Sequence, residues 1–327
     1  MLPGRGGVIA ARTDPAVESV RHTFLTIDGD VRRMQTRALG DTGHESTIAT
    51  FGAIALNWLE QEGANQMVEH VLSKGVNHFD VAPTYGDAEL KLGPKLRQHR
   101  EDIFLGCKTQ ERSYEGAKRK LDRSFDRLGV DYIDLYQVHG LEYESELDEI
   151  TADDGALAAF REAKDEGKIG HIGLTSHGNP GLIRDAIDRI DGLETLMFPL
   201  NPVVVGKGDD EHDYEGVFEA AEEAGIGTLG IKAFARGPWP DTDELPEADR
   251  PFPNWYEPVD TPNEIAERFD FAAAQGLTSV VTPGDPKLVA MVLDAATRYN
   301  GMDETAQRSL VERLRHDESP VPEQLHH

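Results

Sequence analysis

Short apolar runs alternate with segments of helical spacing along most of this 327-residue chain, and this alternation limits its possible folds more than any other feature. Eight runs with the length of buried strands lie at Ile48–Leu56, His78–Ala82, Ile103–Lys108, Ile133–His139, Ile169–Ser176, Leu196–Asn201, Thr228–Phe234 and Ser279–Pro283. Such a chain forms a parallel sheet with helices, either open and doubly wound or closed. The count of eight and the near-even spacing favour a closed (β/α)8 TIM barrel, which needs roughly 250 residues.

The segments between the runs carry signals for helix ends. In Ala64–Gly75 the apolar residues share one face, and the final glycine is a typical helix cap. Further helices are predicted at Tyr114–Leu128, Ala156–Glu166 and Tyr214–Ala224. Pro180 and Pro262 stand where helices are expected to begin, a position that tolerates a residue without an N–H.

Two segments that follow predicted strands are longer than the others: Gly140–Gly155 after the fourth and Ala235–Pro262 after the seventh. Insertions after strands lie on the C-terminal face of a barrel, where active sites are built. The second insertion contains the aromatic residues Trp239, Phe252, Trp255 and Tyr256 among prolines. We expect a loop that covers a substrate, and a packed structural loop is the alternative.

The two ends of the chain are predicted to lie outside the barrel. Residues 1–33 are polar without sustained periodicity and are expected to form a tail that can be disordered. The barrel is expected over residues 34–318, and residues 319–327 form a second tail. Within the barrel unit, Arg37–Thr50 predicts an N-terminal β-hairpin around Asp41-Thr42-Gly43.

Charge and composition exclude several classes of protein. The chain has 33 basic and 60 acidic residues, a net charge of −27, which argues against binding to nucleic acid or to an anionic membrane. No apolar stretch is long enough for a membrane helix or a signal peptide. The single cysteine, Cys107, excludes an intrachain disulfide and a cysteine-based zinc cluster. We therefore expect a soluble cytoplasmic protein.

The acidic surface also suggests a cytoplasm of high salt. Only 11 of the 33 basic residues are lysine, and acidic pairs such as Asp153-Asp154 and Asp209-Asp210 recur in loops. Such a surface repels itself in dilute buffer and is screened in strong salt. We expect a halophilic protein, with an acidic protein of an ordinary cytoplasm as the alternative.

One motif that suggests a dinucleotide site is misplaced. Gly225–Gly230 matches the pattern G-x-G-x-x-G. The dinucleotide fingerprint requires these glycines after a strand and at the start of a helix. Here they follow a predicted helix and lead into the seventh strand, so we do not expect a Rossmann site.

Four residues with complementary chemistry follow or end successive strands. Asp80 and Tyr85 lie at the end of the second strand, Lys108 ends the third, and His139 ends the fourth. A barrel brings these positions together at one rim. A nearby ammonium lowers the pKa of a phenol, and a carboxylate keeps that ammonium charged. Such a phenol can protonate a carbonyl oxygen as hydride reaches the carbonyl carbon, while the imidazole orients the substrate.

From Arg37 to Ala296 the sequence resembles the aldo-keto reductases. The most specific matches are the segments Phe79–Gly86, Phe104–Lys108, Leu128–His139 and Lys168–Ser176. The resemblance implies a (β/α)8 barrel, NAD(P)H as cofactor without a metal, and reversible reduction of aldehydes or ketones. By motif position the resemblance implies that Tyr85 is the general acid, that Lys108 and Asp80 adjust its pKa, and that His139 orients the substrate.

The expected nicotinamide contacts depart from the pattern of that family. Thr175-Ser176 replaces the usual Ser-Asn pair that holds the carboxamide. Met197 replaces a glutamine and cannot form comparable hydrogen bonds. Ile231 replaces the aromatic residue that stacks on the nicotinamide ring.

The expected phosphate contacts also differ. The segment with Gly284, Asp285 and Lys287 replaces one that usually carries basic residues for the 2′-phosphate of NADP. Asp285 would repel a phosphate, whereas Lys287 could bind one. Lys232 and Arg236 add positive charge. NADP is therefore the expected cofactor, and NAD is the alternative.

Two other functions remain alternatives. The weakened nicotinamide contacts leave open a regulatory subunit that senses the redox state of the cofactor with little or no turnover. A metal-dependent hydrolase would need clustered ligands at strand ends, and His171 and His177 alone are too few. We expect Cys107 to be a packed residue and the acidic stretch Glu142–Glu149 to be a solvated rim.

Overall fold

The computed structural model describes residues 33–240, 245–246 and 249–321. The predicted N-terminal tail, apart from Arg33, and residues 322–327 of the predicted C-terminal tail lie outside the described residues. Ser319, Pro320 and Val321, which the sequence assigned to that tail, are described and packed: Val321 is buried, and the Pro320 carbonyl accepts a hydrogen bond from Lys232.

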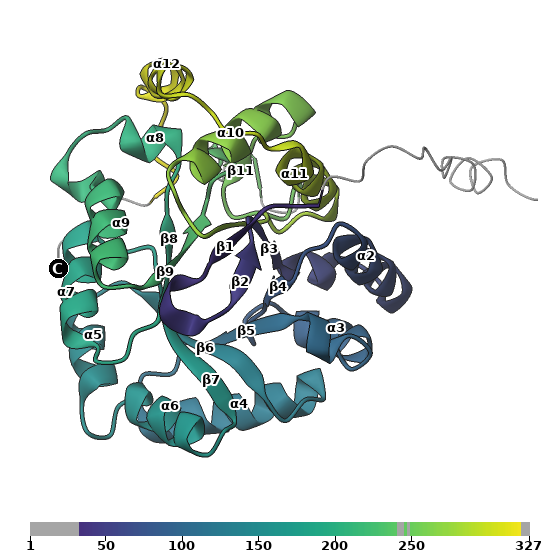
Figure 1. Cartoon of the computed structure of the whole chain (residues 1–327), viewed down its shortest axis with the longest axis vertical. Helices are drawn as coiled ribbons and strands as arrows, with labels where there is room; N and C mark the ends of the chain where they lie inside the picture. Colours follow the sequence, from purple (N-terminus) through teal and green to yellow (C-terminus); the bar gives the residue numbers. More distant parts are fainter. Residues whose placement is uncertain (1–32, 241–244, 247–248, 322–327) are drawn as a thin grey trace, which may run out of the picture. The chain divides into compact units, whose positions relative to one another are not determined.

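Within the described residues, eight parallel strands close into a barrel with helices around it (Figure 1). Closure is direct, because Val280 of the last strand pairs with Ala49 of the first and with Gly230 of the seventh. The strands are β3 (Ala49–Gly52), β4 (His78–Asp80), β5 (Phe104–Thr109), β6 (Ile133–Leu141), β7 (Ile169–Ser176), β8 (Thr195–Pro199), β9 (Gly227–Ile231) and β12 (Ser279–Val281). The predicted (β/α)8 TIM barrel is confirmed, and the open sheet is excluded.

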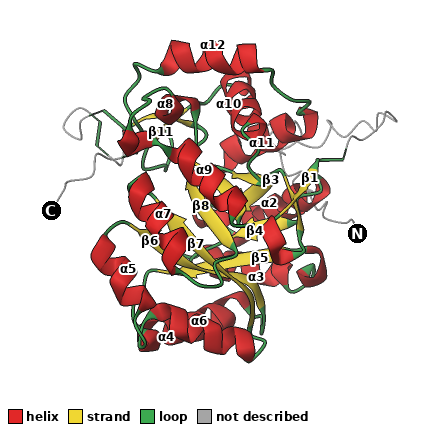
Figure 2. Ribbon diagram, turned by 60° about the vertical axis from the view of Figure 1, so that its left-hand side comes forward, coloured by secondary structure: helices red, strands yellow, loops and turns green. Residues whose placement is uncertain are grey.

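The barrel helices lie outside the strands and bury their apolar faces against them (Figure 2). They are α2 (Gln61–Ser73), α3 (Ala88–Leu96), α4 (Tyr114–Leu128), α6 (Ala156–Asp165), α7 (Pro180–Arg189), α9 (Tyr214–Glu223), α10 (Pro262–Ala274) and α11 (Pro286–Arg298). Ser113 caps α4, and Gly129 ends it in the left-handed conformation that favours glycine. Pro180 and Pro262 begin α7 and α10, as the sequence predicts.

Several shorter elements decorate the barrel. They are η2 (Ala53–Trp58), η3 (Arg100–Asp102), α8 (Pro202–Val205), η4 (Asp210–His212) and α12 (Glu304–Leu314). The first predicted strand, Ile48–Leu56, was too long: only Ala49–Gly52 is strand, because the chain then turns into η2 above the barrel rim. An apolar run does not distinguish a strand from a buried turn of helix.

The predicted hairpin is present at the start of the described chain. Strands β1 (Thr36–Ala38) and β2 (Glu45–Thr47) pair antiparallel around η1 (Gly40–Thr42). A Cβ at Gly227 would lie 2.9 Å from the nitrogen of Gly40, so the glycines of Gly225–Gly230 allow the hairpin to approach β9 closely. This run leads from the end of α9 into β9, and the sequence-based rejection of a Rossmann site agrees with that placement.

Both predicted insertions lie beyond the C-terminal ends of their strands. The insertion after β6 forms α5 (Glu144–Thr151), which packs beside α6 and α7 (Figure 2). The insertion after β9 contains the strand pair β10 (Ala235–Gly237) and β11 (Glu257–Pro258).

His78 of β4 makes the stability of the barrel sensitive to acid. Its side chain is buried and its Nδ1 lies 2.9 Å from the hydroxyl of Ser46. Burial lowers the pKa of His78 to about 3, and the charges of His44 and Lys108 act in the same direction. Because the unfolded chain has the higher pKa, this contribution to stability is lost as the pH falls from about 6.5 toward 3.

We expect His78→Gln to flatten the pH dependence of unfolding. Between pH 7 and pH 5, the wild type should lose about 2 kcal/mol more of its unfolding free energy than the variant does. Urea titrations of both proteins at the two pH values measure this difference. Equal losses would show that His78 is not the group responsible.

Candidate active site

A cavity of about 540 Å³ opens at the C-terminal ends of the barrel strands. The four predicted catalytic residues, Asp80, Tyr85, Lys108 and His139, all line it. Asp80 and Lys108 lie within β4 and β5, His139 lies near the end of β6, and Tyr85 follows β4 in the turn before α3. The rim therefore brings together side chains that lie up to 59 residues apart in the sequence.

Asp80 and Lys108 form a buried ion pair. The Lys108 Nζ lies 2.7 Å from Asp80 Oδ2, and their side chains are 1% and 3% exposed. Gln137 donates a second hydrogen bond, of 3.2 Å, to Asp80 Oδ1. Burial opposes the charged form of Lys108, but Asp80 and Tyr85 outweigh it and raise the pKa of this ammonium. Lys108 is therefore charged at neutral pH.

Tyr85 lies between the ion pair and the imidazole of His139. Its ring centroid is 5.5 Å from Lys108 Nζ and 5.9 Å from the ring of His139. Burial raises the pKa of Tyr85 above its ordinary value, whereas the charge of Lys108 and its hydrogen bond to the hydroxyl lower it. We expected the lowering to prevail, and the burial prevails instead. The hydroxyl stays protonated at neutral pH, as a proton donor must.

His139 is neutral in this surrounding. Burial lowers its pKa well below the ordinary value, and the charges of Lys108, His177 and Arg112 contribute. A neutral imidazole has one N–H donor and one acceptor nitrogen. Its Nδ1 is buried without a hydrogen-bond partner among the described residues, and the residue lines the cavity. As a lining residue with a neutral ring, His139 can offer a directed hydrogen bond to a bound molecule.

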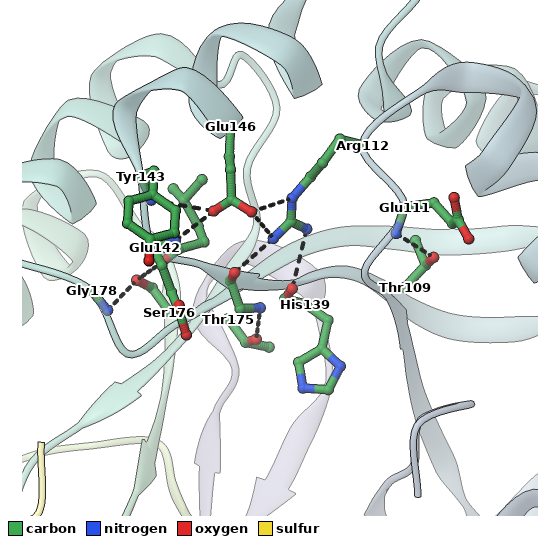
Figure 3. Close-up of polar contacts among 12 residues, drawn as sticks. Thr109, Glu111, Arg112, His139, Glu142, Tyr143, Glu146, Thr175, Ser176 and Gly178 are labelled. Carbon is green, nitrogen blue, oxygen red and sulfur yellow. Dashed lines mark hydrogen bonds and ion pairs between the residues drawn. The ribbon is translucent and has the colours of Figure 1, made fainter. Parts of the chain in front are cut away.

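Thr175 and Ser176, the predicted carboxamide ligands, hold the end of β6 (Figure 3). Thr175 Oγ1 accepts a 2.9 Å hydrogen bond from the N–H of Gly140. Ser176 Oγ donates to the carbonyl of Leu141 at 2.6 Å and accepts from the N–H of Gly178 at 2.9 Å. Thr175 lines the cavity, whereas Ser176 is not among the lining residues.

Three other predicted cofactor residues also line the cavity: Met197, Ile231 and Lys232. The sulfur of Met197 lies 3.7 Å from Lys108 Nζ. The Lys232 amine donates a 3.1 Å hydrogen bond to the Pro320 carbonyl and lies 5.1 Å from the ring centroid of Trp255. Burial lowers the pKa of Lys232 to about 8, which leaves the amine mostly protonated at neutral pH.

The residues predicted after the eighth strand differ in their placement. Gly284 lines the cavity. Asp285 caps α11 instead, because its Oδ1 accepts hydrogen bonds from the N–H groups of Lys287 and Leu288. Lys287 is exposed and does not line the cavity, and Arg236 forms ion pairs with Glu257, Asp260 and Glu264.

Four residues of the insertion after β9 line the cavity: Pro253, Asn254, Trp255 and Tyr256. That the loop covers a substrate stays a prediction. The indole N–H of Trp239 donates to the carbonyl of Asn254 at 2.6 Å, so Trp239 supports this loop from behind. The same insertion therefore lines the cavity and packs on itself.

Sequence reasoning missed Arg112 and misplaced Glu146. Both line the cavity, and Glu146 pairs with Arg112 rather than lying on a solvated rim. No local signal marks Arg112, because its partners come from β6 and α5. His177 also lines the cavity and contacts the ring of Trp255, whereas His171 pairs with Glu194.

The described residues contain no group of three or more side chains arranged to hold a metal ion. In the same part of the chain, no helix combines the length and the hydropathy needed to cross a bilayer.

Known proteins are similar to this chain in sequence and in fold. Residues 50–281 match the model of the aldo/keto reductase family. An uncharacterized oxidoreductase, YqkF, of Bacillus subtilis is 29% identical over 178 residues, which are 50% of this chain and 56% of the relative. An NADP(+) aldo-keto reductase, yakc, of Schizosaccharomyces pombe is 30% identical over 241 residues, 65% of this chain and 66% of the relative.

Solved structures agree on the fold. The holo form of aldo-keto reductase AKR11C1 from Bacillus halodurans superposes with a TM-score of 0.66 at 23% identity, covering 89% of this chain and 99% of that one. The matching segments span from about half to two thirds of the curated relatives described above. The chain belongs to the aldo/keto reductase family.

Proposed function

We propose that this protein reduces an aldehyde or a ketone with NAD(P)H. The observation that carries the proposal is the convergence of Asp80, Tyr85, Lys108 and His139 in one cavity. Family membership supports an oxidoreductase of this class. The cofactor, when bound, supplies the hydride for the carbonyl carbon.

The four residues divide the remaining work. The Tyr85 hydroxyl donates its proton to the carbonyl oxygen, because its raised pKa keeps that proton in place until charge develops on the oxygen. Lys108 stabilises the phenolate that results, and Asp80 keeps the ammonium charged and aimed. The neutral imidazole of His139 donates a hydrogen bond to the same oxygen and orients the substrate.

The cavity residues fit a nicotinamide nucleotide, although not through the usual side chains. Apolar contact comes from Ile231 and Met197, and Lys232 offers positive charge to a phosphate. The buried Nδ1 of His177 and Oδ1 of Asn254 have no hydrogen-bond partner among the described residues. NADP is the proposed cofactor, with NAD as the alternative.

Titration of the protein with NADPH and with NADH, followed by a panel of aldehydes and ketones, tests this function. Trp255 lies at the cavity and should report binding by fluorescence. We expect binding of at least one cofactor and its oxidation with some carbonyl compound. Tight binding without turnover on the whole panel would favour the redox-sensing subunit, which the Met197 and Ile231 replacements leave open.

We also propose that the protein works in a salty cytoplasm. The net charge is −27, so the excess carboxylates repel one another at low ionic strength, and salt screens this repulsion. The unfolding free energy should therefore rise markedly as KCl increases from about 0.1 M to about 3 M. Urea titrations at each salt concentration measure it, and an unchanged value would remove the halophilic interpretation.

A further inference from the structure

The end of β6 departs from regular strand pairing at the residue that orients the substrate. Its register with β7 shifts between Val138 and Leu141, so His139 and Gly140 form an irregular step. Gly140 has a φ of +69°, a conformation that side chains other than glycine rarely adopt. Carbonyl groups in such a step lose their neighbours in the sheet and need other donors.

Arg112 supplies those donors (Figure 3). Its Nη1 donates to the carbonyl of His139 at 3.1 Å, and its Nη2 donates to the carbonyl of Gly140 at 2.6 Å. The imidazole of His139 points away from the guanidinium, toward the opposite side of the strand. One planar side chain thus fixes two successive peptide groups without touching the imidazole.

Glu146 of α5 holds the guanidinium in place. Its Oε1 accepts hydrogen bonds from Nε and Nη2 of Arg112, at 3.1 and 3.0 Å. Its Oε2 accepts from the N–H groups of Glu142 and Tyr143, at 2.8 and 3.2 Å, which fixes the carboxylate at the start of α5. The side chains of Arg112 and Glu146 are 11% and 25% exposed, so solvent screens this pair only in part.

Thr175 of β7 fixes the irregular segment at Gly140 from the side of β7. Its hydroxyl accepts the N–H of Gly140, so the peptide groups on both sides of Gly140 are fixed. The end of β6 is therefore held between the loop after β5, the helix α5 and the end of β7.

We infer that Arg112 and Glu146 are positioning residues, which set the direction of the His139 imidazole into the cavity by clamping the backbone of His139 and Gly140. The expected effect of these residues on turnover rests on the proposed function. Their expected effect on the orientation of the His139 imidazole does not. It gives the insertion after β6 a role, since α5 supplies Glu146.

A purely structural role for the pair is the competing explanation. In that case Arg112 and Glu146 would only anchor α5. A second ion pair of α5 distinguishes the two explanations: Asp148 pairs with Arg189 of α7 and forms no hydrogen bond or ion pair with the described residues of β6. Arg189→Ala removes this contact of α5 and leaves the hydrogen bonds at Gly140 in place, so it serves as the control.

The decisive variant is Arg112→Lys. It keeps the positive charge but loses the planar guanidinium that donates to the carbonyls of both His139 and Gly140. Histidine-labelled protein, with the His139 signal assigned from a His139→Gln spectrum, reports the imidazole by NMR. Tyr85 packs against this ring, and the charges that act on it come from Lys108, His177 and position 112. The substitution keeps a positive charge at position 112, so the charges around the ring stay the same. We expect the His139 signals to shift and its pKa to rise toward the ordinary value as water reaches a loosened ring.

Turnover gives the second measurement. A misplacement of about 1 Å at a reacting group costs about 10²-fold in rate. We expect Arg112→Lys to lower kcat/KM for a carbonyl substrate by roughly 10- to 100-fold, with the dissociation constant of NADPH changed by less than about twofold. Arg189→Ala should change neither measurement. Glu146→Ala should give a smaller effect in the same direction, since Arg112 keeps its contacts with both carbonyls.

Three results would overturn the inference. One is a folded Arg112→Lys protein whose His139 signals and kcat/KM match the wild type. Another is an effect of Arg189→Ala as large as that of Arg112→Lys, which would mean that Arg112 and Glu146 only anchor α5. If Arg112→Lys does not fold, an unchanged His139 signal in Glu146→Ala counts against the inference in the same way. A wild type without turnover would refute the proposed function alone, because the NMR comparison still decides the positioning.

Discussion

Tyr85→Phe is expected to lose carbonyl reduction by roughly 10²- to 10⁴-fold while binding the cofactor as tightly as the wild type. The substitution removes the hydroxyl that we propose delivers a proton to the carbonyl oxygen, and it leaves the aromatic ring, which packs beside His139. The loss should appear in kcat and in kcat/KM alike, since the proton is needed only in the transition state. Steady-state kinetics and a fluorescence titration with NADPH measure the two quantities.

Tyr114→Phe provides the matched control for that experiment. Tyr114 lies on α4 outside the cavity, and its hydroxyl contacts Glu162. The control should turn over as the wild type does. Near-wild-type turnover in Tyr85→Phe would refute the role of Tyr85 as the proton donor.

Lys108→Met is expected to destabilise the fold strongly. It leaves the Asp80 carboxylate buried without its ammonium, and breaking one partner of a buried pair costs about 3–5 kcal/mol. Lys74→Met, which removes a partly exposed pair with Asp294, should stay within about 1 kcal/mol of the wild type. Urea titration at neutral pH measures both variants.

The pH dependence of Lys108→Met gives a second test. Burial raises the pKa of Asp80, against the opposing effects of Lys108 and Gln137, and removing Lys108 raises it further. With the folded pKa above the unfolded one, the deficit should shrink as the pH falls and Asp80 takes up a proton. The double variant Lys108→Met/Asp80→Asn should recover part of the loss. A deficit of less than about 1 kcal/mol would mean that the pair is not isolated from water.

The sequence predicted the placement of those residues that are fixed by strand ends. Asp80, Lys108 and His139 follow apolar runs, and parallel strands of a closed barrel present their ends at one rim, so their meeting follows from topology alone. Tyr85 lies five residues beyond Asp80, in a short turn that leaves it little freedom. For these residues, knowledge of the strand order was sufficient.

The contacts that the sequence did not predict depend on local departures from the regular fold. The hydroxyls of Thr175 and Ser176 are engaged because β6 is irregular at Gly140, and no apolar pattern encodes that step. Asp285 caps a helix that begins one residue later, so its carboxylate faces backbone N–H groups. Arg112 acquires its role from partners in β6 and α5, which the spacing of its own segment does not reveal.

The pKa of Tyr85 shows the same limit in energetic terms. The sequence identifies Lys108 as a neighbour that lowers the pKa of Tyr85, but it does not reveal how far the hydroxyl is buried from water. Burial proves to be the larger effect. In the proposed reaction, Tyr85 therefore keeps its proton until negative charge develops on the carbonyl oxygen beside it.

Transfer of deuterium from the nicotinamide of labelled NADPH, or of labelled NADH, to a carbonyl substrate tests the central claim most directly. Mass spectrometry of the alcohol formed by the wild type, with Tyr85→Phe in parallel, measures the transfer. The proposal predicts one deuterium at the former carbonyl carbon of each alcohol molecule formed by the wild type, and roughly 10²- to 10⁴-fold less labelled alcohol from the variant in the same time. Alcohol without label from the wild type, or equal amounts of labelled alcohol from both proteins, would contradict carbonyl reduction at this cavity with Tyr85 as the proton donor.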